Sequence, residues 1–136
     1  MVQIAVNPFV LRDVDLTIGT DNYEAHVSQV EFVPAAAALT WIGLANNTHA
    51  ATATATWTVT LAGAQDWATT NSLSQYLHDN EGTVVPVTFT PADGQGSFTA
   101  DVTISPANIG GTGGAFSVFS VSLGCTKPAF TAAVVV

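Results

Sequence analysis

Charged side chains are scarce in this chain of 136 residues, and basic ones are almost absent. Only 9% of the residues are charged, whereas about 25% is usual in a soluble domain. Arg12 and Lys127 are the 2 basic residues against 10 acidic ones, which gives a net charge of −8. Proteins that bind nucleic acid through its phosphates need several basic contacts. The composition therefore excludes such binding by a single copy.

Cysteine is scarce, and long apolar runs and a secretory leader are missing. Cys125 is the single cysteine, which excludes an internal disulfide and a cysteine-based zinc site. The most apolar stretch, residues 32–45, is interrupted by proline, threonine and glycine, so it lacks the roughly 18 apolar residues that cross a membrane. Residues 1–10 have neither the basic start nor the cleavage site of a signal peptide. We therefore expect synthesis in the cytoplasm and no membrane contact.

So few charges cannot cover the surface of a monomer. A compact chain of 14.0 kDa exposes about 6,700 Å², and most of that surface would consist of Thr, Ser, Ala and Val. Contiguous apolar surface of this kind usually marks an association site. The composition therefore predicts an assembly of many copies.

Alternating residue patterns predict six strands. In residues 53–61, Ala, Trp, Val and Leu alternate strictly with Thr, which is typical of a half-buried strand. The other predicted strands are residues 12–18, 23–33, 84–90, 97–104 and 115–123. We expect one mainly β domain over residues 1–136, an antiparallel β-sandwich or barrel with one flanking α-helix.

One segment, residues 66–80, departs from the alternating pattern. Leu73, Tyr76 and Leu77 recur at helical spacing, and Ser72 and Gln75 have the spacing of a capping box. Glycine follows at position 82, where a helix would stop. The pattern predicts a helix within 66–80, with the tryptophan at position 67 packed against it.

Residues 34–51 form a connection longer than the roughly 12 to 15 residues that unstructured loops usually reach. The segment is too apolar to be disordered. We interpret it as a hairpin or arm that packs on a neighbouring subunit. The candidate subunit-interface residues are Ala36, Ala38, Leu39, Trp41, Ile42 and Leu44.

Chemical motifs point to no active site. The glycines at 110–114 match neither a P-loop nor a dinucleotide fingerprint, and no nucleophile elbow is present. Glu24 and His26 would share one face of a predicted strand and could hold a metal with Asp13 or Asp15, but a polar cross-strand face is the expected explanation. Cys125 is expected to be a small packed side chain or an inert thiol. We expect no enzyme, no metal and no cofactor.

The remaining histidines carry no chemical motif. His78 falls near the C-terminal end of the predicted helix, where a cation is favourable. His49 lies within the predicted arm and has no assigned role.

The order of strand, long arm, helix and strands resembles the siphophage major tail proteins, the subunits that stack as hexameric rings into a tail tube. The resemblance covers nearly the whole chain, although this chain carries no appended immunoglobulin-like domain. The stretches that carry it are residues 13–19, the strand at 27–34, Trp41, the Trp57 strand leading into Gln65-Asp66-Trp67, Phe89-Thr90-Pro91 with Phe98-Thr99-Ala100, and the loop at 106–114.

The resemblance implies a β-sandwich or barrel with a flanking helix, close to the ring-forming tube proteins of contractile injection systems. It implies a structural role in a virion tail, built from subunits made in the host cytoplasm, with inner strands that line a channel for genomic DNA. Its partners would be further copies, a tape-measure protein and other tail proteins, without active site or cofactor. Scarcity of basic residues agrees with such a channel, because each phosphate contact would hold passing DNA.

Two other functions remain open on the sequence. A capsid decoration or cementing protein is also small, β-rich and acidic, and would form trimers rather than a filament. A carbohydrate-binding, adhesin-type β-sandwich could use Trp41, Trp57 and Trp67 to stack on sugar rings. Core packing is expected for Trp57 and Trp67, which leaves Trp41 as the open position.

Overall fold

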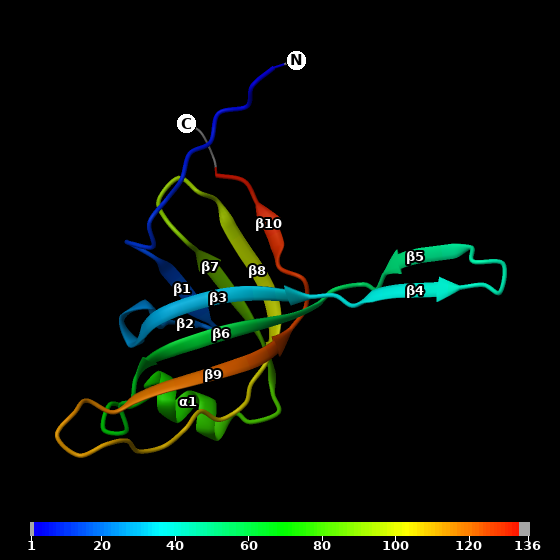
Figure 1. The fold of residues 1–136 in the computed structure, drawn as a ribbon. Coiled ribbons are helices and arrows are strands. Elements are labelled where there is room, and N and C mark those ends of the chain that lie inside the picture. Colours follow the sequence, from blue (N-terminus) through cyan, green and yellow to red (C-terminus); the bar gives the residue numbers. More distant parts are fainter. Residues whose placement is uncertain (1, 134–136) are drawn as a thin grey trace.

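The computed structural model describes residues 2–133 as a body of two β-layers from which a hairpin projects (Figure 1). The elements, in chain order, are β1 (Asp15–Ile18), β2 (Asp21–Asn22), the 3-10 helix η1 (Glu24–His26), β3 (Val27–Ala35), β4 (Ala38–Ile42), β5 (Thr48–Thr52), β6 (Thr56–Ala64), α1 (Leu73–Asp79), β7 (Val84–Thr90), β8 (Ser97–Thr103), β9 (Val118–Cys125) and β10 (Ala129–Thr131). The fold is mainly β with one α-helix, as the sequence predicts.

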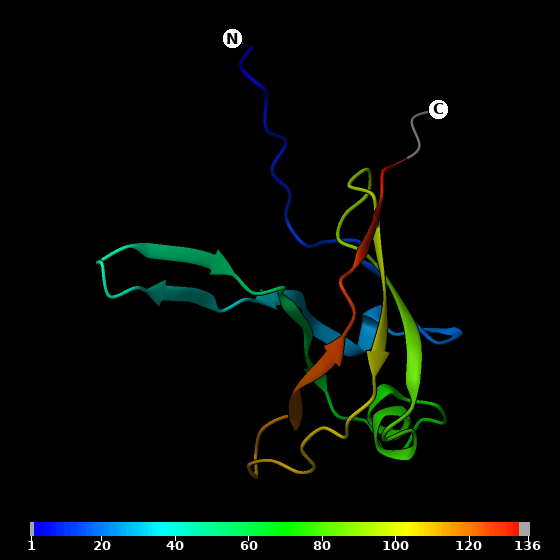
Figure 2. The same cartoon turned by 90° about the vertical axis from the view of Figure 1, so that its right-hand side faces the viewer.

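The body strands pair antiparallel in the order β2-β1-β7-β8-β9-β6-β3, and β10 pairs with β8. Strands β8 and β9 share one register pair, Val102 with Cys125, among the described residues. The sheet therefore splits into two layers, with β3, β6 and β9 crossing in front of β1, β7, β8 and β10 (Figure 1; Figure 2 shows the layers from the side). Strands β4 and β5 form a separate two-stranded sheet.

The alternating pattern of each strand places its apolar side chains between the two layers. Val59 and Leu61 of β6 are buried against the opposite layer, while Thr60 between them points outward. Strand β7 alternates in the same way through Val85, Val87 and Phe89. Burial of apolar side chains from both layers is the main stabilising term of such a body.

Helix α1 lies at one end of the body, beneath β9 in Figure 1. Its Leu73 and Leu77 are fully buried in the same core cluster as the strands. The helix thus closes the lower end of the space between the layers. Across residues 2–133, no helix is long and apolar enough to span a membrane.

The helix is shorter than the predicted range 66–80, because the preceding residues form a turn. The Asp66 carboxylate accepts hydrogen bonds from the backbone N–H of Ala68 (3.0 Å) and Thr69 (3.1 Å). Asn71 has a left-handed φ of 63°, and its carbonyl accepts a hydrogen bond from the hydroxyl of buried Tyr23. Hydrogen bonds from Thr69 and Ala68 lower the pKa of Asp66. Regular helix therefore begins only after Ser72.

Ser72 is the N-cap, in agreement with the capping-box spacing. Its Oγ accepts a hydrogen bond from the Gln75 backbone N–H at 3.4 Å and donates to the Asp66 carbonyl. We expect Ser72→Ala to lower the free energy of unfolding by about 1 kcal/mol, because a buried cap is lost. Urea unfolding followed by circular dichroism measures this change. Exposed Thr70→Ala is the control, and equal midpoints for the two variants would contradict the assigned cap.

Several predicted strand ends are wrong, each for a backbone reason. Residues 12–14 precede β1 because Asp13 has a positive φ of 50°. Residues 53–55 link the hairpin to β6, so the alternating run at 53–61 belongs to two different parts of the molecule. Residues 115–117 belong to a loop that follows Gly114, whose φ is 83°. Strand β7 has the predicted limits.

The predicted strand at residues 23–33 begins instead with η1 and continues as β3. The pairing of β3 with β6 shifts register between Val27 and Gln29. Opposite this shift lies Gly63, where an added Cβ would stand 2.0 Å from the His26 carbonyl oxygen. Only glycine permits this close approach of the two backbones.

Candidate functional site

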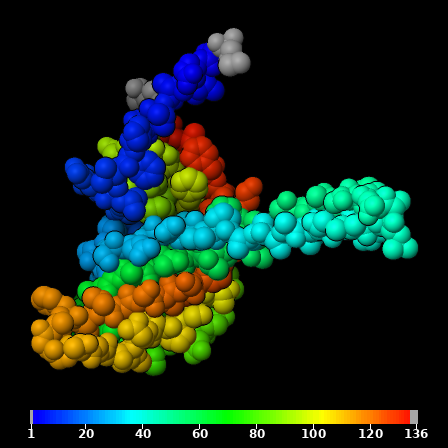
Figure 3. All heavy atoms as spheres, viewed as in Figure 1, coloured from blue at the N-terminus to red at the C-terminus, as the bar shows by residue number. Residues whose placement is uncertain are grey.

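The β4–β5 hairpin, called here the arm, leaves the body between β3 and β6 and extends away from it (Figures 1 and 3). Every residue of β4 and β5 is exposed. Two-stranded hairpins are marginally stable on their own in water. The predicted arm is thus present as a hairpin, and the interface role assigned to it is still a prediction.

The residues predicted for the subunit interface all lie on the arm or its approach. Ala36 precedes β4 and Leu44 is fully exposed in the turn. The other four residues lie within β4. These are Ala36, Ala38, Leu39, Trp41, Ile42 and Leu44.

One face of the arm is the more apolar. Trp41 pairs with His49 and Leu39 with Ala51 in the β4–β5 register, so these four side chains share a face. The Trp41 and His49 rings lie 5.7 Å apart, and Trp41 is still 60% exposed. We call this set the arm face. It carries no Asp, Glu, Lys or Arg.

A groove of about 620 Å³ opens between the two layers of the body, and we call it the aromatic groove. Its walls come from both layers, from β10 and from the segment before β1. The aromatic lining residues are Phe9, Phe32, Trp57, Phe89, Phe98 and Phe130.

Sequence reasoning missed this groove because its lining residues come from six separate segments. Strand β10 was also missed, since three residues are too few to show an alternating pattern.

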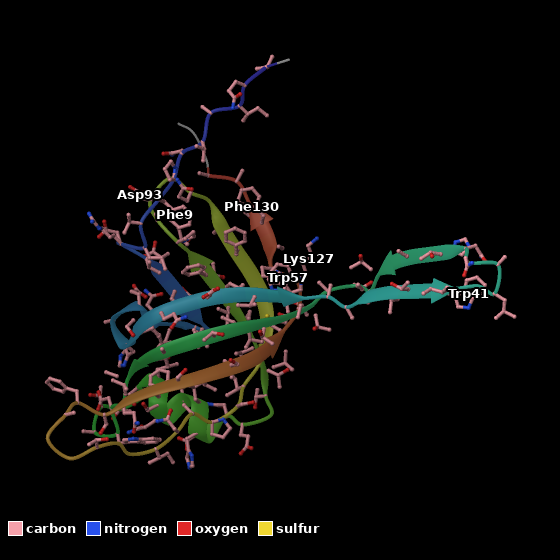
Figure 4. All side chains as sticks on the ribbon, viewed as in Figure 1. Phe9, Trp41, Trp57, Asp93, Lys127 and Phe130 are labelled. Atoms are coloured by element: carbon pink, nitrogen blue, oxygen red, sulfur yellow. The ribbon has the colours of Figure 1, made fainter. Side chains whose placement is uncertain are left out.

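The Phe98 and Phe130 rings lie 5.4 Å apart across the β8–β10 pair. Figure 4 shows Phe9, Trp57, Lys127 and Phe130 gathered at this part of the body, while Trp41 lies far out on the arm.

Both basic residues of the chain lie beside this groove. Lys127 is part of its lining, and Arg12 lines an adjoining groove of about 360 Å³. The two grooves share four lining residues, Leu11, Gln29, Val30 and Phe89. Neither cation belongs to a strand of the two layers as the structure describes them.

The outward face of the β3-β6-β9 layer consists of small and mostly neutral side chains. Register pairing places Glu31, Thr60 and Ser122 in one row across the three strands, and Val33, Thr58 and Gly124 in the next. The Thr60 and Ser122 hydroxyls lie 3.4 Å apart. We call this surface the hydroxyl face. Its residues are Gln29, Glu31, Val33, Ala35, Thr56, Thr58, Thr60, Ala62, Ala64, Val118, Ser120, Ser122 and Gly124, with one carboxylate and no Lys, Arg or His.

The remaining candidates from the sequence do not form a site. Glu24 and His26 lie on η1 rather than on a strand, which corrects the prediction of a shared strand face. The Glu24 carboxylate accepts a hydrogen bond from the Leu16 backbone N–H at 3.4 Å, and the His26 ring packs edge-on against Tyr23. Among residues 2–133, no group of three or more His, Cys, Asp and Glu side chains could hold a metal ion.

Cys125 ends β9 and packs against the core, and burial raises the pKa of its thiol. The neutral thiol is therefore favoured over the reactive thiolate.

The tryptophans lie on three separate parts of the molecule. Trp57 lines the aromatic groove and Trp41 lies on the arm. Trp67 is 41% exposed and stands edge-on to His78 of α1, which corrects the expectation that Trp67 is a core residue. No pair of tryptophans thus forms a common platform for a sugar in the described part of the chain.

The loop between β8 and β9 is held by two side chains, Gln65 just after β6 and Asn108 within the loop. The Gln65 side chain donates to the carbonyls of Gly110 and Val118, both at 2.8 Å, and accepts from the Gly110 N–H at 3.0 Å. Asn108 bonds to the backbone of Val118 and Ser120. These contacts fix the glycine-rich segment to the start of β9, and in the part of the chain that the structure describes no helix begins there to bind phosphate.

The body and arm together expose much more surface than a compact chain. The total is 9245 Å², compared with about 6,700 Å² for a compact monomer of this mass, an excess of roughly 2,500 Å². A standard protein interface buries about 800 Å² on each partner. The excess is therefore enough for about three such contacts.

Comparison with solved structures finds chains of similar fold in an injection system. No family model and no curated protein matches the sequence. One similar solved chain comes from a cryo-EM structure of an extracellular contractile injection system, its PVC sheath/tube terminator in the extended state. It aligns with a TM-score of 0.65 and 12% identity over 95% of this chain and 100% of that one.

A second similar chain comes from the PVC sheath-tube complex of such a system in the extended state, with a TM-score of 0.64, 12% identity and 93% of both chains covered. At 12% identity, these likenesses show a shared fold. Both neighbours come from a contractile injection system rather than from a siphophage tail, so the finer resemblance to siphophage proteins is still a prediction.

Proposed function

We propose that this chain is a self-assembling tail-tube subunit whose copies form stacked sixfold rings around a passage for DNA, as in the siphophage major tail proteins. The observation that carries the proposal is the arm, which exposes an apolar face outside the body. A folded chain with roughly 2,500 Å² of surplus surface on a total of 9245 Å² is suited to burial among its own copies. The shared fold with chains of an injection particle supports the same role.

The hydroxyl face is suited to the wall of the passage. It has no cation to hold a phosphate, and its hydroxyls and single carboxylate would let a polyanion pass. Strand β3 is the edge of this layer, since within residues 2–133 it pairs with β6 alone. An edge strand offers unpaired backbone groups to a neighbouring chain. Pairing through β3 would extend the layer around a ring once contacts of the arm hold neighbouring copies together.

In this proposal, the protein resides in the tail of a virion and contacts a tape-measure protein and other tail proteins. DNA is cargo rather than a bound ligand. The role is structural and requires neither a catalytic group nor a cofactor.

The mass of the purified protein in solution, combined with electron microscopy, tests the proposal. We expect rings and stacked tubes with a mass that is a multiple of six chains. A monomer at every concentration and salt condition would contradict it. A stable trimer that does not polymerise would favour the decoration or cementing protein instead.

A further inference from the structure

We propose that the arm face of one copy docks in the aromatic groove of a second copy. The proposal rests on the proposed self-assembly and names the two surfaces that carry it. Both surfaces are apolar, both are open to solvent in the single chain, and they lie on different parts of the molecule.

The groove has the size and chemistry for such an occupant. Its volume of about 620 Å³ lies within the range of roughly 300 to 1,000 Å³ that specific pockets span. Phe9 and Phe130 at its margin are 50% and 62% exposed, so docking would remove much apolar surface from water. Large aromatic side chains in a pocket are the usual anchors of a protein interface.

The charges of the two surfaces favour this pairing. Lys127 and Glu31 border the groove with opposite signs, Glu31 from the edge strand β3 where it also belongs to the hydroxyl face, so a neutral occupant needs no compensating charge. The arm and the residues that join it to the body, 36–55, contain no Asp, Glu, Lys or Arg. Its exposed Trp41 also gives Lys127 an aromatic ring on which an ammonium group can pack.

The occupant is a second copy because the arm extends away from the groove of its own chain (Figures 3 and 4). Contact between two different surfaces of identical chains is heterologous, and it continues from copy to copy until a ring closes or a filament grows. The same contact between an arm and a groove therefore explains how the chain builds an assembly rather than a dimer.

Complementation between two defective variants tests the docking. Trp41→Asp removes the arm anchor, and Phe130→Asp places a charge in the groove. We expect each variant alone to remain monomeric. Their equal mixture should form dimers and nothing larger, because one intact arm then meets one intact groove. Sedimentation velocity measures the three samples, and Thr40→Asp, on the opposite face of β4, should assemble as the wild type does.

Phe9→Asp is a second groove variant. Phe9 precedes β1 and belongs to none of the described strands, so the substitution should not disturb folding. It should behave as Phe130→Asp does. If both groove variants assemble as the wild type does, or if the mixture stays monomeric, the docking is overturned while the proposed tube function stands. Assembly that is lost in Phe116→Asp and kept in both groove variants also overturns it, because the arm then contacts the loop. A wild-type chain that never assembles overturns both proposals.

Discussion

Replacing residues 36–55 by an Asn-Gly turn is expected to abolish assembly and leave a folded monomer. Ala35 and Thr56 are directly paired at the end of the β3–β6 ladder, and a two-residue Asn-Gly turn joins two antiparallel strands at such a position. The core cluster contains no residue of the arm, so the body should keep its cooperative unfolding. Light scattering gives the mass, and circular dichroism with thermal unfolding reports the body.

A matched control keeps the arm and changes its other face by Thr40→Ser, which should leave the mass of the assembly unchanged. Tubes built by the turn variant would show that the arm is not needed for assembly. An unfolded turn variant would contradict the separation of arm and body.

Lysine on the hydroxyl face is expected to make the assembled tube bind DNA instead of letting it pass. Ser122 is exposed on β9 and faces away from the core, so Ser122→Lys should fold and assemble. Each ring would then present about six ammonium groups to the passage. Contacts with six or more phosphates make affinity fall by about a thousandfold or more between 50 and 200 mM salt.

Co-sedimentation of tubes with a short fluorescent DNA duplex measures this change. Wild-type tubes should retain no duplex at 50 mM salt, whereas Ser122→Lys tubes should retain it at 50 mM and release it at 200 mM. Thr99→Lys is the control, because Thr99 is exposed on β8 of the other layer. Retention by Thr99→Lys tubes and none by Ser122→Lys tubes would place the passage on the other layer and contradict the assignment.

Parts of the fold could be predicted because their signals are local. The alternation in residues 84–90 marks β7 with its observed limits, and Ser72 caps the helix as its spacing with Gln75 indicates. The long apolar connection marks the arm. The interface residues named from the sequence are exposed on that arm, and their contacts in an assembly are still a prediction.

Other parts could not be predicted, because their causes are contacts between distant segments. Alternation in residues 53–61 continues across the base of the arm, so the pattern alone cannot show where β6 begins. Trp67 has the apolar character of a core residue, yet it packs beside His78 on the surface. Asp13 adopts a left-handed backbone conformation that no local pattern announces.

By itself, the amino-acid sequence determined the β class, the position of the helix cap, the presence of an arm and the lack of cations for holding DNA. Those properties follow from residue spacing and composition, which act over a few neighbours. Only the tertiary structure decided that β9 lies beside β6, that both cations stand next to one groove and that six segments build its walls. Strand pairing joins residues that are far apart in the chain. An alternating pattern shows which side chains face the core, but it is the same whichever strand lies alongside, so it does not identify the partner.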